Sequence, residues 1–287
     1  MRSEPRPERG KTARARHGMT LVEMLVGLVV SGIMLGALVG LFINQSQLTG
    51  DRASRRVARD VVRSGSQILS ADIRRLESSG GVEAASADSV TLRVPLAIGL
   101  VCGSSGGGSP STTVSLLPTD SVRYATAAVS GFAWRSQAGA YTYMPTTGLG
   151  SGTASTCSSA SVSTLSGGRV VELTAGSGAI PAGAPALLYE RIRYAFTDTG
   201  SGVALVRTLV ESGDREVLVT NFSDGGTRFR FFVGSSGTAQ DAPPADLSDL
   251  TGLELVLEGQ GDRPRVSDGA VATVPLTVPV YFKNQMN

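Results

Sequence analysis

One carboxylate stands at the start of a long uncharged segment near the N-terminus. Glu23 is the only charged residue between Met19 and Ile43, and the twenty residues 24–43 carry no charge. At helical rise, such a segment would extend about 30 Å, which is the thickness of the hydrocarbon core of a bilayer. A carboxylate in apolar surroundings costs several kcal/mol unless a cation faces it. Glu23 is therefore the first candidate functional residue, and a positive partner is the chemistry it requires.

Side chains that support catalysis are scarce elsewhere. The single histidine is His17, so the commonest general base and metal ligand is missing from everything that follows it. No Gly-x-Ser-x-Gly motif stands between a strand and a helix, and neither a phosphate-binding loop nor a dinucleotide fingerprint occurs. Asp241, Asp246 and Asp249 could coordinate Ca²⁺, but their spacing lacks the EF-hand pattern. We expect no enzymatic activity, no cofactor and no metal site.

The two cysteines, Cys102 and Cys157, lie in a Gly/Ser-rich part of the chain. They have no C-x-x-C spacing and no histidine near them, which argues against a zinc site. In an oxidising compartment, a disulfide between them would close a loop of about 55 residues and contribute roughly 4 kcal/mol in the chain-entropy model. Two free thiols are the alternative.

Residues 16–23 resemble the prepilin signal shared by type IV pilins and the pseudopilins of type II secretion. The features that coincide are a basic leader, a Gly, a Thr-Leu pair, a Glu and an uninterrupted apolar helix. The resemblance implies that a prepilin peptidase cuts after Gly18 and that Met19, where the family usually has Phe, becomes the N-methylated first residue. It also implies that Glu23, the fifth mature residue, pairs with the N-terminal ammonium of a neighbouring subunit during assembly.

Two simpler interpretations of this N-terminus compete with the prepilin signal. An ordinary secretory signal has an apolar region of about 7–15 residues followed by a small-residue cleavage site, whereas this run is longer and ends in Phe42-Ile43-Asn44-Gln45. A plain single-span anchor would explain the span but not Glu23, although that side chain could reach the membrane interface.

The charge balance of the mature chain differs from that of the whole. The formal net charge is +2 over 287 residues, but residues 1–18 carry six Lys and Arg against two acids, so their removal leaves a net charge near −2. No overall basic bias points to nucleic acid. A charged content of 17%, 36 glycines and abundant serine fit an extracellular β-rich domain with long loops better than a cytosolic enzyme.

A group of five arginines follows the apolar run: Arg52, Arg55, Arg56, Arg59 and Arg63. With basic residues on both sides of the span, charge alone gives a weak preference for a cytoplasmic N-terminus. The prepilin resemblance gives the same orientation, with the leader in the cytoplasm and the body outside. The group is the best candidate for nucleic-acid contact, but no aromatic residue is interleaved for base stacking. We interpret it as the polar face of a helix near lipid phosphates or acidic neighbours.

The helix is expected to continue beyond the apolar run. Apolar residues recur at helical spacing between the arginines: Val57, Val61, Ile68, Ile73 and Leu76. A helix from Thr20 to about Ser78 would be close to 90 Å long. Its first half would lie in lipid or in a filament core, and its second half would pack on a globular domain. Four glycines in the first half would let helices approach closely, or are ordinary membrane-helix glycines: Gly27, Gly32, Gly36 and Gly40.

After Gly81 the pattern changes to period two, which is typical of β-strands. Strands are expected at residues 89–94, 188–196, 203–210, 217–222, 229–233 and 253–257. Gly-containing turns separate the later strands and predict an antiparallel meander. Residues 270–283 contain Pro275 and Pro279 and should form an edge strand or a broken strand. Residues 102–168, rich in Ser, Thr, Gly and Ala, are expected to be an insertion or extended loop region held by the disulfide.

Together these expectations define an α+β fold, in which a long N-terminal transmembrane helix packs on a mainly antiparallel β-sheet domain. Residues 1–18 would be the leader, 19–43 the transmembrane or filament-core helix, and 44–79 its amphipathic continuation. Residues 80–287 would form an extracytoplasmic β-rich domain with the Ser/Gly-rich insertion at about 102–168. The order of its C-terminal sequence segments resembles that of PilW-like minor pilins, and J-type pseudopilins are similar: residues 189–194, 205–207 and 217–222, a Phe-rich strand, and residues 253–257.

The resemblance implies a minor type IV pilin that enters or primes a pilus, held in the inner membrane before assembly and in the pilus, periplasm or cell surface afterwards. Its partners would be prepilin peptidase, other pilin subunits, the inner-membrane assembly platform and membrane lipid; direct contact with nucleic acid is a weaker expectation. The alternatives are a type II secretion pseudopilin or, from a different class, a membrane-tethered periplasmic enzyme or binding module.

Overall fold

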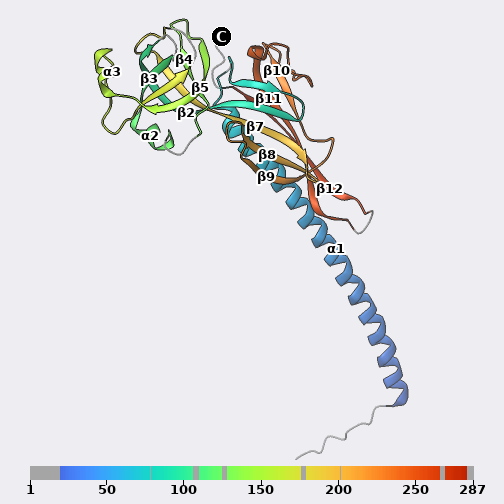
Figure 1. The fold of residues 1–287 in the computed structure, drawn as a ribbon. Coiled ribbons are helices and arrows are strands. Elements are labelled where there is room, and N and C mark those ends of the chain that lie inside the picture. Colours follow the sequence, from blue (N-terminus) through green and yellow to red (C-terminus); the bar gives the residue numbers. More distant parts are fainter. Residues whose placement is uncertain are drawn as a thin grey trace, which may run out of the picture. The chain divides into compact units, whose positions relative to one another are not determined.

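The computed structural model describes residues 20–77, 79–105, 110–124, 128–175, 179–200, 202–265 and 269–282. The chain divides into two units, Met1–Gly50 and Asp51–Asn287. A long N-terminal helix is followed by a mostly antiparallel β-sheet domain, which confirms the expected α+β class (Figure 1). The expected cleavage residues Gly18 and Met19 lie outside the described residues.

The helices, in chain order, are α1 (Leu21–Ile73), α2 (Pro118–Tyr124), α3 (Ala154–Ser159) and the short 3₁₀ helix η1 (Leu247–Asp249). The strands are β1 (Val82–Ala85), β2 (Ser89–Ser105), β3 (Ser111–Leu116), β4 (Gly131–Arg135), β5 (Tyr141–Ser151), β6 (Val170–Ala175), β7 (Pro185–Asp198), β8 (Val203–Leu209), β9 (Arg215–Phe222), β10 (Arg228–Val233), β11 (Leu250–Pro264) and β12 (Val271–Tyr281).

Helix α1 ends earlier than the sequence pattern indicates, at Ile73 instead of near Ser78. The last turns tighten, because Arg75 N–H donates to the carbonyl of Asp72 and Leu76 N–H to that of Ile73, each only three residues back. The chain then turns, and Leu76 is fully buried in the core of the globular unit. Leu76 belongs to the core as expected, but it reaches it from the turn and not from the helix.

The second half of α1 buries a stripe whose members lie three or four residues apart, as one face of a helix requires: Ser54, Ala58, Val61, Val62, Gly65, Leu69 and Ile73. The expected apolar face is therefore confirmed, but small residues make up much of it. Val57 and Ile68 lie at its margin, partly buried against the core.

Small residues bring the backbones of α1 and β11 into close contact. A Cβ atom added to Gly259 would collide with the carbonyl oxygen of Ala58, and one added to Gly261 would collide with the hydroxyl of Ser54. Ser54 Oγ also donates a hydrogen bond to the carbonyl of Arg263 at 3.1 Å. Glycines in a strand interior frequently mark such close approach of another backbone.

A curved sheet wraps around this half of α1, with the strand order β1-β2-β7-β8-β9-β11-β10 and with β12 paired to β11. All expected strands occur here, within β2, β7, β8, β9, β10 and β11. The pairing is antiparallel, but it is not a simple meander: β9 neighbours β11 through the pair Phe222–Gly259, while β10 pairs with the first half of β11. The length of β11 allows one strand to serve both neighbours.

Strand β12 is an edge strand, as expected, because β11 is its only partner among the described strands. Phe282 N–H donates to the carbonyl of Thr251 in β11, so alternate residues of β12 direct their N–H groups toward β11. Pro275 and Pro279 have the opposite parity. Their missing N–H groups therefore fall on the unpaired side, where no ladder bond is lost.

The region 102–168 is not an extended loop. Strands β2, β3, β6, β5 and β4 pair in succession, β4 pairs with β7, and β7 pairs back with β2, so six antiparallel strands close into a barrel. Its core consists of small and medium side chains around Phe132, Leu116, Leu173 and Leu188. The expected loop character was wrong because Ser, Thr and Gly are compatible with a narrow barrel whose closure supplies every strand with two neighbours.

The expected disulfide between Cys102 and Cys157 is formed. Cys102 lies on β2 and Cys157 on α3, and both are buried beside Val162 in a small third cluster. The disulfide thus attaches α3 to the outside of the barrel.

Candidate functional site

The first turn of α1 is capped by a residue that the sequence analysis did not single out. Thr20 Oγ1 accepts a hydrogen bond from the backbone N–H of Glu23 at 3.3 Å, and Met24 N–H donates to the carbonyl of Thr20 at 3.2 Å. Thr20 is therefore the N-cap. The signal was present, because Thr-x-x-Glu before an apolar run is the capping-box pattern. The cap fixes where the helix starts and places Glu23 in its first turn.

The carboxylate of Glu23 has no cationic partner within the described part of the chain. The side chain is exposed, and none of the ion pairs formed by the described residues includes it. A position in the first turn favours a negative charge, because the helix dipole is positive there. This local contribution is typically below about 1 kcal/mol and would not offset the cost of taking a carboxylate into an apolar environment.

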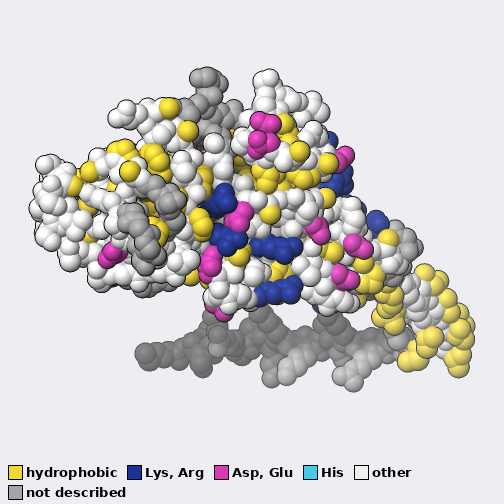
Figure 2. Space-filling model, turned by 45° about the horizontal axis from the view of Figure 1, so that its top comes forward, with side chains coloured by type: hydrophobic (Ala, Val, Ile, Leu, Met, Phe, Trp, Pro, Cys, Tyr) yellow, Lys and Arg dark blue, Asp and Glu magenta, His cyan; other side chains and the backbone are white. Residues whose placement is uncertain are grey.

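After Glu23, the apolar half of α1 is not buried by any other part of the described chain. Every residue from 21 to 43 is exposed, including Leu21 at 80%, Leu28 at 75% and Phe42 at 73%. Hydrophobic side chains cover this segment (Figure 2, yellow at the right). In the described chain, α1 is the one helix long and apolar enough to cross a membrane. A segment this apolar needs lipid or other apolar helices around it.

The glycines of this segment lie at positions where a larger side chain would have free space around it. Added Cβ atoms at Gly27, Gly32, Gly36 and Gly40 would meet nothing within 4 Å. The fold of this chain therefore gives no reason for glycine at these positions. Close approach of a helix from another chain is a role that small residues can fill in a membrane.

The comparison with known families agrees with this N-terminal site. Residues 13–39 match the family model described as the prokaryotic N-terminal methylation motif. No curated protein and no solved structure matches the chain. The motif indicates a type IV pilin-like or pseudopilin protein and implies processing by prepilin peptidase and pilin-like assembly in general. Together with the exposed apolar helix it supports anchoring in a membrane.

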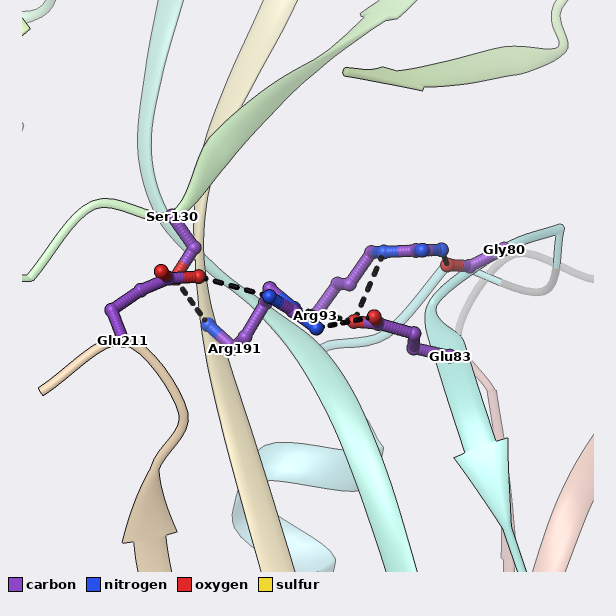
Figure 3. Close-up of polar contacts among 6 residues, drawn as sticks. All are labelled: Gly80, Glu83, Arg93, Ser130, Arg191 and Glu211. Carbon is purple, nitrogen blue, oxygen red and sulfur yellow. Dashed lines mark hydrogen bonds and ion pairs between the residues drawn. The ribbon is translucent and has the colours of Figure 1, made fainter. Parts of the chain in front are cut away.

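A polar network lies on the outer face of strands β2 and β7 (Figure 3). Arg93 and Arg191 are directly opposite each other in the β2–β7 ladder, a repulsive arrangement for two like charges. Glu83 lies between them: its carboxylate accepts two hydrogen bonds from Arg191, at 2.6 and 2.7 Å, and stands 3.7 Å from Arg93 Nε. Glu211 also pairs with Arg191, at 3.1 Å. In Figure 2, basic and acidic side chains gather near the middle of the displayed face.

The network stabilises structure and contains no group suited to catalysis. The hydrogen bonds that Arg191 donates to Glu83 raise the pKa of Arg191, so this guanidinium stays charged. Arg93 donates to the carbonyl of Gly80 at 2.7 Å, and its guanidinium lies over the ring of Tyr143, 5.0 Å from the centroid. The guanidinium groups are held by these partners, and no nucleophile stands beside a base in this arrangement.

A second polar network lies on the inner face, under the end of α1. Tyr194 Oη donates to Asp72 of the helix at 2.5 Å, and Arg207 Nη2 stands 3.6 Å from Glu190. Burial raises the pKa of Tyr194 and of Glu190, with Arg207 acting in the opposite direction on both. This network joins α1 to strands β7 and β8.

Two of the three loop acids considered as a calcium site, Asp241 and Asp246, have other partners for their side chains. Asp241 pairs with Arg230 at 2.8 Å, and Asp246 accepts the backbone N–H of Ser248 at 2.9 Å, which lowers the pKa of Asp246. Within the described ranges, His, Cys, Asp and Glu side chains form no group of three that could hold a metal ion. Asp246 is thus a helix cap and Asp241 an ion-pair partner.

A binding module would require a built cavity in the globular unit. Among the open hollows of the described unit, one of about 410 Å³ lies along β5 and β6, with Arg169 as its charged lining residue. Another, of about 400 Å³, lies beside the end of β4 and the segment before β7. Arg135 is the only charged residue among its described lining residues, and Trp134 the only aromatic one. No set of polar groups converges there, so the hollow does not compete with the N-terminal site.

Proposed function

We propose that this chain is a minor type IV pilin that is cut after Gly18 and enters or primes a pilus through α1. The observation that carries the proposal is the pairing of a prepilin-type signal with an apolar helical segment, residues 21–43, that is exposed throughout in the described chain. Assembly supplies what the fold lacks, because neighbouring helices would cover the apolar half of α1. The chain of 287 residues, leader included, is long for a major subunit, which favours a low-copy role at the start or tip of a pilus.

Glu23 is proposed to guide the register of assembly. The carboxylate stands at the head of the apolar segment with no cation beside it, and cleavage after Gly18 would create an ammonium on Met19. When helices stack in an apolar core, the ammonium of one subunit facing Glu23 of another would offset much of the desolvation cost of both charges. A stack shifted by one turn would leave both charges unpaired and is therefore disfavoured.

The globular unit is proposed to be a non-enzymatic body. Most charged groups of its polar networks have ion-pair or hydrogen-bond partners, although Arg93 Nε and Arg207 Nε form no hydrogen bond in the described chain, and its two cores are apolar. The body would present its surface at or near the pilus tip, while α1 would mediate assembly. A membrane-tethered enzyme would instead need converging nucleophile, base and orienting groups.

The cleavage step is tested with Gly18→Ala. We expect the variant to keep its leader completely, because the peptidase site must accept a residue without a side chain there. Mass spectrometry of the mature N-terminus gives the readout, and methylated Met19 is expected in the wild type. Gly27→Ala is the matched control, since an added Cβ there meets nothing within 4 Å. An unprocessed wild-type chain would refute the proposal.

The assembly step is tested with Glu23→Val and Glu23→Gln. Both variants should be processed and remain in the membrane, but their incorporation into sheared pili should fall by about tenfold or more, the equivalent of roughly 1.4 kcal/mol or more. Glu23→Gln keeps the shape of the side chain and isolates the charge. Normal incorporation of both variants would show that the carboxylate has no role in assembly.

The prepilin-type signal is shared with pseudopilins, so the signal alone does not separate the two groups. Deletion of the gene separates the two. Loss of surface pili with normal secretion supports the pilin, whereas retained pili with a block in the export of folded proteins assigns the chain to type II secretion.

A further inference from the structure

One end of the globular unit gathers arginines from two segments that are far apart in the sequence. The first segment is the start of the second half of α1, and the second is the hairpin between β11 and β12. We define the basic collar as the seven arginines of these segments: Arg52, Arg55, Arg56, Arg59, Arg63, Arg263 and Arg265.

The contact between Ser54 and β11 brings the two segments together. Ser54 Oγ donates to the carbonyl of Arg263 at 3.1 Å, and Gly261 leaves room for the same hydroxyl. Arg263 therefore lies level with Arg52 and Arg55 along the helix. Figure 1 shows the hairpin alongside α1. The sequence alone gave only the five helix arginines, because nothing in it placed the hairpin beside them.

The five collar arginines of α1 are exposed to solvent and form no ion pair within the described residues. The opposite side of the helix, at Ser54 and Ala58, is buried against β11, so Arg52 and Arg55 must face solvent. No ion pair of the described residues includes any of the five helix arginines. Arg263 is 81% exposed and has one weak contact, 3.7 Å to Asp262. Elsewhere in the unit, Arg191 and Arg230 have close carboxylate partners.

The charge excess of the collar is positive even when its acids are counted. Asp51, Asp60 and Asp262 are the described acids within the two segments, against seven arginines. The mature chain as a whole is close to neutral or slightly acidic. The positive charge is therefore local to this end of the unit, and local charge is what a short-range partner responds to.

We propose that the basic collar binds the anionic headgroups of the membrane that holds α1, which seats the globular unit on the bilayer before assembly. This proposal rests on the membrane anchoring described above. Lipid is the favoured partner because the chain itself continues from the collar into its apolar segment. No aromatic residue is interleaved with the helix arginines to stack on bases, which disfavours nucleic acid.

Distances along the helix decide which arginines matter. Nine residues separate Ile43 from Arg52, which is about 13 Å at helical rise. The headgroup layer extends about 5–7 Å beyond the hydrocarbon core, and charges act over a further Debye length of about 8 Å. Arg52 and its neighbour Arg263 are thus within reach. Arg63 stands about 30 Å beyond Ile43 and is out of reach.

The experiment uses the full chain in lipid nanodiscs, with a fluorophore attached through Thr273→Cys and quenched by spin-labelled headgroups. Thr273 is exposed on β12 near the hairpin and pairs with Gln260. Discs of phosphatidylcholine alone are compared with discs that also contain phosphatidylglycerol. We expect quenching to rise about twofold or more with the anionic lipid and to fall again at high salt.

Two double variants test the residues. Arg52→Gln with Arg263→Gln should abolish the effect of phosphatidylglycerol, whereas the charge-matched Arg63→Gln with Arg169→Gln should retain it. All four side chains are exposed, and unchanged thermal unfolding confirms that each variant is folded.

The possible failures are distinguishable. Equal quenching in both lipids, with the protein firmly in the discs, overturns the collar proposal and leaves the anchor intact. Failure to enter the discs at all would instead overturn the proposed function. If lipid has no effect and a labelled oligonucleotide binds the wild type but not the Arg52→Gln, Arg263→Gln variant, the collar is a nucleic-acid surface.

Discussion

The globular unit has two cores, which bury the apolar faces of their strands in different ways. In the barrel, six strands close on themselves and bury one face of every strand around Phe132. In the wrapped sheet, the strands stay open, and the second half of α1 fills the concave face. Strands β2 and β7 run through both and pair from Ser89–Ala195 to Leu100–Pro185. Two different cores are thus built on one shared ladder.

The contents of the two cores follow from their geometry. The barrel interior is narrow and is filled mainly by Ala, Val and Leu, with a disulfide outside. The wrapped sheet has room for aromatic side chains: Phe196 meets Phe222 edge to face and Phe229 at a tilt, with ring centroids 5.5 and 5.0 Å away. Only one of the two cores, that of the wrapped sheet, therefore depends on α1, the helix that begins within the N-terminal methylation motif.

The largest effect should come from removing the disulfide, in the double variant Cys102→Ala with Cys157→Ala. Loss of a 55-residue cross-link is expected to lower the free energy of unfolding by about 4 kcal/mol in the chain-entropy model. If the two cores are separable, hydrogen exchange should accelerate in β3, β5 and β6 of the barrel and much less in α1. Equal loss of protection in the α1 stripe would show that the two cores unfold as one.

A smaller effect with the opposite pattern is expected for Gly259→Ala. The added Cβ would collide with the carbonyl of Ala58, and a backbone atom cannot move aside as a flexible side chain can. Overpacking of this kind costs about 1–3 kcal/mol. Protection should be lost first in the second half of α1, while the barrel remains protected.

Gly150→Ala provides the control for that substitution. Gly150 also lies in a strand, but its added Cβ would meet only atoms of Glu172, at an ordinary 3.9 Å. Its melting temperature should stay close to that of the wild type. If Gly259→Ala melts like Gly150→Ala, the close approach of α1 and β11 does not limit stability.

The wrapped sheet could be predicted from the sequence, and the barrel could not. Strands such as β7 and β10 alternate apolar and polar residues because one face is buried and the other is wet, and this alternation is readable. In β3, residues 112 to 116 are all buried, because α3 and its disulfide cover the outside of the barrel there. A strand buried on both faces has no alternation, and a Ser/Thr-rich one does not look apolar either.

The N-terminal site could be predicted from residue types and their spacing because its residues lie close together in the sequence. Glu23 and the apolar run need no tertiary fold to be recognised, and the N-cap Thr20 is equally local, because it lies three residues before Glu23 in a capping-box pattern. Long-range features were out of reach. The pairing of Arg93 with Arg191 through Glu83 depends on a bulge in β1 and on the register of β2 with β7. Neither the bulge nor the register can be read from the sequence pattern.

The smallest effect concerns the ladder that the two cores share, where Glu190 lies on β7 close to the barrel. Burial raises the pKa of Glu190 above its ordinary value, and Arg207 only partly offsets this. The unfolded chain therefore releases this proton at a lower pH than the folded chain. Below the ordinary pKa of Glu, the protonated Glu190 side chain contributes fully to the free energy of unfolding. This contribution is lost as the pH rises through the raised pKa that Glu190 has in the folded chain.

Comparison of the wild type with Glu190→Gln isolates this contribution from that of the other carboxylates. The difference in unfolding free energy, wild type minus variant, should become less favourable to the wild type as the pH is raised from about 4 toward 7, since the ordinary pKa of Glu is near 4.3. Chemical unfolding at each pH gives the measurement. A flat profile for Glu190→Gln would mean that the shared ladder does not hold this carboxyl in a dry environment, and that water reaches the junction between the two cores.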